Sequence, residues 1–269
     1  STRCDQAGAG GEGGVRIKAT PWNLPAQDCF TESYAVRGRF ANLVNAHANV
    51  IASVRSVSYG IAAAARNLPL ERNQEILVLE DQFPSNIYSW KKLSEKRKAT
   101  LTMIRRSEAR TGNGPLDWTQ ALLDRIHDRT GIVALPHCHW TDGSLIDLAR
   151  VSKKIRAHGA HLVLDITQSG GAMPIDVQEV QPDFLICACY KWLLGPYSLG
   201  FMYVSPKWQN GEALEETWLG RVGSEDFRRL VDYQETYQPG AVRFDMGERS
   251  NFHLMPMANA ALEQLLEWG

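Results

Sequence analysis

The chain has 269 residues, of which 44% are hydrophobic and 22% charged, proportions that are ordinary for a soluble globular protein. Its 29 basic and 30 acidic residues leave a formal net charge of -1, so no global positive field favours nucleic acid or an anionic membrane. No apolar run approaches the roughly 20 residues that a membrane-spanning helix needs. We therefore expect no nucleic-acid partner and no membrane.

The N-terminal segment is small, polar and rich in glycine. Its sequence, STRCDQAGAGGEGG (1–14), has no apolar core, which argues against a secretory signal and against packing. We therefore expect 1–24 to form a flexible arm and 25–269 to form one large domain. Five cysteines are dispersed without paired C-x-x-C spacing, at positions 4, 29, 138, 187 and 189. This pattern favours reduced thiols and therefore a cytoplasmic location.

Beyond the arm, short apolar runs alternate with longer amphipathic segments. Strands are predicted over 49–54, 75–81, 99–105, 131–137, 160–167, 184–190 and 199–204. Helices are predicted over 27–46, 56–68, 86–97 and 116–129, and in the second half of 141–159. The alternation indicates an α/β fold with a mostly parallel central sheet and helices on both faces. Such sheets bind ligands at the carboxyl ends of their strands.

Two charged residues stand at the ends of consecutive apolar strands. Lys191 follows the apolar run 184–190, where a lysine is either snorkelling to water or used as an amine. Asp165 closes another buried strand, and by itself it is best explained as a cap of the following segment. Together, a carboxylate and a lysine are the protein groups that pyridoxal phosphate chemistry requires.

The surrounding residues make the comparison specific. D-x-x-Q-S-x-G at Asp165, followed by K-W-L-x-G-P at Lys191, resembles the class V aminotransferase superfamily of fold type I pyridoxal-phosphate enzymes. That superfamily includes aminotransferases, cysteine desulfurases, selenocysteine lyases and kynureninases. The similarity runs from about Val15 to the end of the chain. The resemblance implies that 25–269 is a cofactor-binding large domain.

The resemblance also implies roles around the cofactor ring. Lys191 matches the lysine that forms the Schiff base, and Asp165 matches the carboxylate that bonds the ring nitrogen. Gln168 matches the residue beside the ring hydroxyl. Tyr190 takes the position that contacts the phosphate in kynureninases, where desulfurases usually carry His. Phe83 takes the place of the stacking aromatic, as in kynureninases.

Further cofactor residues follow from the same resemblance. The N–H of Val57 and the side chain of Ser58, at the start of the predicted 56–68 helix, match the phosphate-binding segment. Asn86 approaches the ring from the loop of Phe83, and His137 and His139 are candidate substrate-side or ring-side residues. With Asp142 these histidines also suggest a metal site, but no second Cys/His cluster exists, so we expect no metal.

The 241–251 stretch resembles the family segment R-F-E-x-G-T-P, which reaches the cofactor phosphate of a partner subunit. Glu248 stands where Thr is usual, and Arg249 is a candidate substitute for that contact. The resemblance thus implies a homodimer. It also implies a small C-terminal domain that carries the substrate-carboxylate arginine, and we expect that domain to be absent or truncated in this chain.

These observations predict a pyridoxal-phosphate-dependent enzyme that acts on an amino acid through a Lys191 Schiff base. Kynureninase-like or desulfurase-type cleavage of a C–C or C–S bond on the same scaffold is the alternative. A non-catalytic remnant of the fold also stays open. A nicotinamide-binding protein is disfavoured, because the glycine-dense 8–14 stretch precedes any predicted strand and opens no helix.

Overall fold

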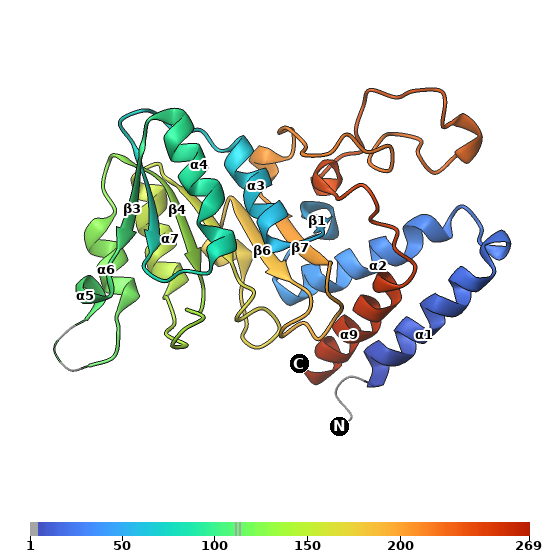
Figure 1. The fold of residues 1–269 in the computed structure, drawn as a ribbon, viewed down its shortest axis with the longest axis horizontal. Helices are drawn as coiled ribbons and strands as arrows, with labels where there is room; N and C mark the ends of the chain where they lie inside the picture. Colours follow the sequence, from blue (N-terminus) through green and yellow to red (C-terminus); the bar gives the residue numbers. More distant parts are fainter. Residues whose placement is uncertain (1–4, 111, 113) are drawn as a thin grey trace.

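The computed structural model describes residues 5–110, 112 and 114–269, which form an α/β fold around one sheet (Figure 1). The seven strands have the order β1-β7-β6-β5-β4-β2-β3. Strands β2 to β6 run parallel to their neighbours, whereas β7 is antiparallel to both β1 and β6. Their bounds are β1 Ile51–Val54, β2 Glu75–Leu79, β3 Thr100–Ile104, β4 Thr130–Pro136, β5 His161–Asp165, β6 Phe184–Ala188 and β7 Gly200–Val204. The predicted fold class and each predicted strand are confirmed.

Helices cover both faces of the sheet because successive residues of each buried strand point to opposite sides. Ile76 and Val78 of β2 pack with α3 and α4, whereas Leu77 and Leu79 pack on the side of α2, α6, α7 and α9. The longer helices are α1 Asp5–Ala19, α2 Asp28–Leu43, α3 Val57–Asn67, α4 Tyr88–Arg97, α6 Trp118–Arg125, α7 Leu148–Ala157 and α9 Leu254–Trp268. Single turns of helix form α5 Arg106–Ala109 and α8 Val177–Val180.

The N-terminal segment corrects one expectation. Residues 5–19 form helix α1 beside α9 instead of a flexible arm, and residues 1–4 lie outside the described part (Figure 1). Glycines make the contact possible: a Cβ at Gly10 would lie 2.6 Å from the carbonyl oxygen of Pro256, and one at Gly14 would lie 2.0 Å from that of Phe252. The glycine content that suggested an unpacked arm therefore permits close helix–helix approach.

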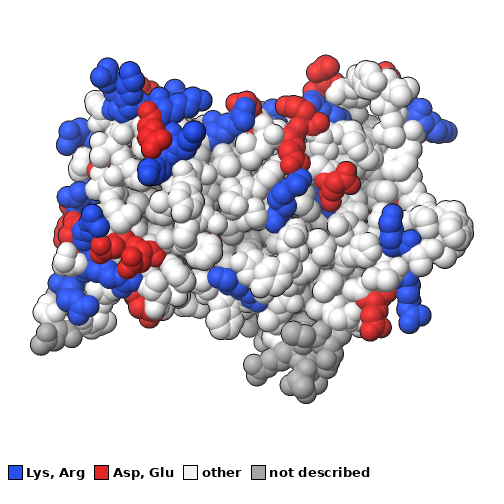
Figure 2. Space-filling view, viewed as in Figure 1, with Lys and Arg blue, Asp and Glu red and all other residues white. Residues whose placement is uncertain are grey.

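The surface agrees with the near-zero net charge. Acidic and basic side chains are interspersed over the face in Figure 2, apart from a group of exposed basic residues on α4: Lys91, Lys92, Lys96 and Arg97. In the residues that the structure describes, we find no helix with the length and apolar character needed to cross a membrane.

Candidate active site

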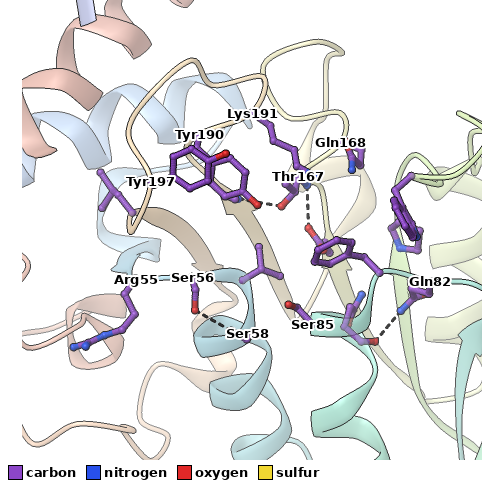
Figure 3. Close-up of a pocket in the computed structure, with 18 of the residues that line it drawn as sticks. Arg55, Ser56, Ser58, Gln82, Ser85, Thr167, Gln168, Tyr190, Lys191 and Tyr197 are labelled. Atoms are coloured by element: carbon purple, nitrogen blue, oxygen red, sulfur yellow. Dashed lines mark hydrogen bonds between the residues drawn. The ribbon is translucent and has the colours of Figure 1, made fainter. Parts of the chain in front are cut away.

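A cavity of about 250 Å³ lies where β2, β4, β5 and β6 end and α3 begins (Figure 3). Because these parallel strands end at the same edge, residues far apart in sequence meet there. Eight predicted site residues line it: Val57, Ser58, Phe83, Asn86, Asp165, Gln168, Tyr190 and Lys191. The structure thus brings together most of the side chains that the sequence analysis singled out.

Lys191 lies among aromatic rings at the mouth of this cavity. Its Nζ is 5.3 Å from the ring centroid of Phe83 and 6.0 Å from that of Tyr190. The loop after it holds Leu194 and Ser198 in left-handed backbone conformations, with φ of 59° and 62°. Such conformations are uncommon for residues other than glycine and concentrate at functional sites. The amine is therefore presented to the cavity by a constrained turn.

Asp165 ends β5 and is 7% exposed. Its Oδ1 accepts the N–H of Thr167 at 3.0 Å. Burial raises the pKa of this carboxyl, and the hydrogen bonds from Thr167 and the charge of Lys191 only partly oppose that effect. A buried carboxylate in this state is stabilised by any cationic N–H group that enters the cavity.

The N-terminus of α3 forms another part of the wall. Ser56 is the N-cap of this helix, with its Oγ accepting the N–H of Tyr59 at 3.1 Å. The Oγ atoms of Ser56 and Ser58 are 3.0 Å apart. Arg55 also lines the cavity and pairs with Glu215 at 2.8 Å. Free N–H groups, hydroxyls and a guanidinium form a donor set suited to a phosphate.

Asn86 supplies an unused donor. The residue is fully buried, and its Oδ1 accepts the indole N–H of Trp90 at 2.8 Å. Its Nδ2 has no hydrogen-bond partner among the residues that the structure describes. Because an unpaired buried donor is costly, a ligand acceptor in the adjoining cavity would satisfy it. Gln82, which the sequence analysis did not name, holds this loop by donating to the carbonyl oxygens of Asn86 and Ala134 at 2.9 and 3.1 Å.

The two predicted histidines do not line the cavity, which corrects that expectation. His139 is fully buried, with its ring stacked on Trp118 at 5.4 Å and its Nε2 3.0 Å from the carbonyl oxygen of Glu80. His137 contacts the hydroxyl of Ser169 at 3.0 Å, and burial lowers its pKa. Successive residues of an extended segment point to opposite sides, and this alternation continues past the end of β4. Positions 136, 138 and 140 therefore face the cavity, and positions 137 and 139 point away from it.

Several cavity residues escaped the sequence analysis. Trp140 is the most prominent, and the alternation beyond β4 is the signal that would have found it. Tyr197 stacks on Tyr190 with centroids 4.1 Å apart and planes 10° apart. No local sequence signal places Tyr197 there, because the loop that follows Lys191 decides its position.

Arg249 was expected to be a candidate phosphate ligand, but the structure places it elsewhere. It is fully buried, bonds Asp245, and donates to the carbonyl oxygen of Leu219 at 3.2 Å. Asp245 also pairs with the buried Arg37 of α2 and accepts the N–H of Ser53 at 2.8 Å. The 245–249 turn therefore serves as an internal charged link between α2 and β1.

Comparison with known proteins decides the family. The family model "Aminotransferase class-V" matches residues 25–261, most of the chain. The chain belongs to this family. Its members use pyridoxal phosphate, as the class V resemblance of the Asp165 and Lys191 motifs had implied. The prediction of the family is thus confirmed.

Relatives and solved structures agree with this assignment. The class V chain is 28% identical over 207 residues to the "Uncharacterized aminotransferase YcbU" of Bacillus subtilis, covering 76% of this chain and 52% of that protein. It is 28% identical over 225 residues to a kynureninase of Deinococcus radiodurans, covering 82% and 51%. A C-DES mutant with glycine covalently linked to its PLP cofactor superposes with a TM-score of 0.81 at 17% identity, covering 98% and 68%. The chain thus spans about half the length of the curated relatives it matches.

Proposed function

We propose that this class V chain is part of a pyridoxal-phosphate-dependent enzyme that acts on an amino acid and binds its cofactor covalently through Lys191. The observation that carries the proposal is the convergence of a lysine amine, a buried carboxyl, a stacking aromatic and a helix N-terminus on one cavity. These groups come from α3, the β2–α4 loop and the ends of β5 and β6. They are chemically complementary to an aldehyde, a ring nitrogen, an aromatic ring and a phosphate.

The residues present fit the cofactor. The carboxyl of Asp165, whose pKa is raised by burial, would bond the protonated ring nitrogen, and Phe83 would lie against the ring. Ser58 and the N–H of Val57 would hold the phosphate, with Arg55 as an additional cation. Gln168 and Asn86 would supply further polar contacts on the ring side, and Tyr190 on the phosphate side. When bound, the cofactor supplies an electron sink for the substrate Cα carbanion.

Lys191 would have a second role as general base. Its Nζ, when released from the cofactor, would accept the proton from the substrate Cα and later donate that proton back to the reacting molecule. The partly buried position of Lys191 and the aromatic rings of Phe83 and Tyr190 limit the water around that amine. The rings thus limit competing proton exchange with water at the position where the amine would take the substrate proton.

Transamination is the branch we propose first, in a homodimer of the whole protein. Cleavage of a C–C bond is the second candidate. The observation that favours it is the pair of aromatic residues, Phe83 and Tyr190, at positions where kynureninases resemble this chain more closely than desulfurases do. The kynureninase relative of Deinococcus radiodurans, at 28% identity, supports the same candidate.

The test is the visible spectrum of the purified chain after incubation with pyridoxal phosphate and dialysis. We expect an absorbance band at about 410–430 nm, as covalently bound pyridoxal phosphate shows. The band should be lost in Lys191→Ala and kept in Lys153→Ala, a control that removes an exposed lysine of α7. Borohydride reduction followed by peptide mass analysis should find the cofactor on Lys191. A band that survives Lys191→Ala, or label on another lysine, would contradict the proposal.

A further inference from the structure

Trp140 has an exposed ring and a polar atom that is already hydrogen-bonded. Its side chain is 48% exposed, at the wall of the cavity, although tryptophan is among the largest apolar side chains. Its one polar atom is already satisfied, because Nε1 donates to the carbonyl oxygen of Asp81 at 2.6 Å. The exposed part of this side chain is therefore its apolar ring, held in place.

The loop that carries Trp140 is also fixed by charge. Arg106 donates Nε to Asp81 at 2.9 Å and Nη1 to Asp142 at 2.6 Å, and it bonds the hydroxyl of Thr141. It thereby ties the loop of residues 140–142 to the turn before Phe83. An aromatic ring that is both exposed and preorganised is typical of a binding contact, since little entropy is lost when a ligand covers it.

The orientation of the ring indicates what it binds. Trp140 and Phe83 have centroids 5.6 Å apart, but their planes meet at 89°. One planar group cannot stack on two faces that are perpendicular to each other. Phe83 is the face nearest Lys191 Nζ, at 5.3 Å, so a group joined to Lys191 is the one that Phe83 meets. The face of Trp140 is left for a second planar group.

The charges of the cavity restrict that second group. Among the described residues that line it, the charged ones are Arg55, Asp165 and Lys191. In the proposed function Arg55 would hold the phosphate, Asp165 the ring nitrogen, and Lys191 first the cofactor and then the substrate Cα proton. Among the described residues of the cavity wall, no further charged side chain is left to pair with an ionic substituent beside Trp140, so an uncharged apolar ring fits this position best.

We propose that Trp140 is a specificity-determining residue and that the substrate is an amino acid with an uncharged aromatic side chain, which stacks on the Trp140 ring. This inference rests on the proposed function, because it assigns the cofactor to Phe83 and the substrate side chain to Trp140. The Arg106 bridge positions the ring without touching the substrate.

The test measures binding of two uncharged amides that lack the α-amine and therefore cannot react, 3-phenylpropionamide and 4-methylpentanamide. Calorimetric titrations of the cofactor-loaded chain give the ratio of their Kd values. We expect the aromatic amide to bind more tightly, and we expect this preference to fall about 2- to 10-fold in Trp140→Leu. Trp140→Phe should retain most of the preference, and Trp22→Leu, which removes a 78% exposed tryptophan outside the cavity, should leave it unchanged. Thermal melting followed by circular dichroism confirms that each variant is folded.

The outcomes separate the two proposals. A loaded chain that binds both amides equally, or binds neither, overturns the assignment of an aromatic substrate. A preference that is the same in wild type and Trp140→Leu overturns the role of Trp140, and the retained preference in the folded Trp140→Phe variant excludes a merely structural effect. A chain that never acquires the absorbance band at about 410–430 nm refutes the proposed function itself, on which this inference rests.

Discussion

The buried charge cluster of Arg37, Asp245 and Arg249 gives the sharpest prediction about stability. One carboxylate stands between two guanidiniums, and Asp245 and Arg249 are fully buried while Arg37 is 5% exposed. Burial lowers the pKa of Arg37, nearby Arg249 lowers it further, and the attraction of Asp245 opposes both. Asp245→Asn removes the only negative charge of this cluster while keeping the shape of the side chain.

The magnitude follows from what the substitution leaves behind. Asparagine still accepts the N–H of Ser53, which now reaches Asp245 Oδ1 at 2.8 Å, so that backbone bond is preserved. What is lost is the negative charge that neutralises the two buried guanidiniums. Breaking a buried ion pair by removing one partner costs about 3–5 kcal/mol of unfolding free energy. Domains of this kind have about 5–15 kcal/mol of stability in total, so the variant should lose a large part of it.

Urea denaturation followed by circular dichroism at neutral pH measures this loss. The control is Glu263→Gln, which breaks the exposed Arg39–Glu263 pair at 3.1 Å and should cost about 0.5 kcal/mol or less. The double variant Arg37→Met/Asp245→Asn removes one of the two stranded cations. We expect it to be more stable than the sum of the single variants predicts, by about 1–3 kcal/mol.

Two results would refute this reasoning. A cost of less than about 1 kcal/mol for Asp245→Asn would mean that the cations are not desolvated as the structure has them. Simple additivity in the double variant would mean that Arg37 and Asp245 are not coupled, whatever the cost of the single substitution.

Three further predictions concern pH, a loop and a helix contact. Burial opposes ionisation of Asp183, yet hydrogen bonds from a histidine, a lysine, an indole and a backbone N–H lower its pKa to about 2 from 3.8. Its carboxylate therefore contributes about 2 kcal/mol to the free energy of unfolding above pH 4, and this contribution is lost as the pH falls from about 4 to about 2. Asp183→Asn should make the unfolding free energy, measured in urea at several pH values, fall less steeply over that range. The same pH dependence in variant and wild type would contradict this prediction. Arg106→Gln should cost about 1 kcal/mol of unfolding free energy in urea, since it removes hydrogen bonds to two carboxylates. The neighbouring Arg105→Gln should cost clearly less. Equal losses in the two variants would argue against a special role of Arg106 in fixing the 140–142 loop. Gly60→Ala places a Cβ 2.7 Å from Cγ1 of buried Ile186. Overpacking should cost about 1–3 kcal/mol, which outweighs the gain of about 1 kcal/mol in helix propensity, so the melting temperature should fall. A melting temperature above that of wild type would show that Ile186 moves to accommodate the new methyl group.

The sequence predicted the sheet and the centre of the site for local reasons. Buried parallel strands are recognisable as short apolar runs, and the strand carrying Ile76, Leu77, Val78 and Leu79 is an example with both faces covered. Lys191 stands out because a charge at the end of such a run needs an explanation. These signals depend only on residues adjacent in the chain.

The tertiary structure decided the features that depend on contacts between residues far apart in the sequence. Helix α1 packs closely against α9 because Gly10 and Gly14 meet the backbone within and just before α9, a long-range contact that composition alone does not reveal. His139 was expected beside the ring but is buried on Trp118, because the alternation of β4 continues beyond the strand. Arg249 was expected to be a phosphate ligand but pairs with the buried carboxylate of Asp245, which also holds Arg37 of the distant helix α2. Local patterns thus determined which residues are buried and where strands end, whereas the partner that each polar or aromatic side chain meets was set by long-range packing.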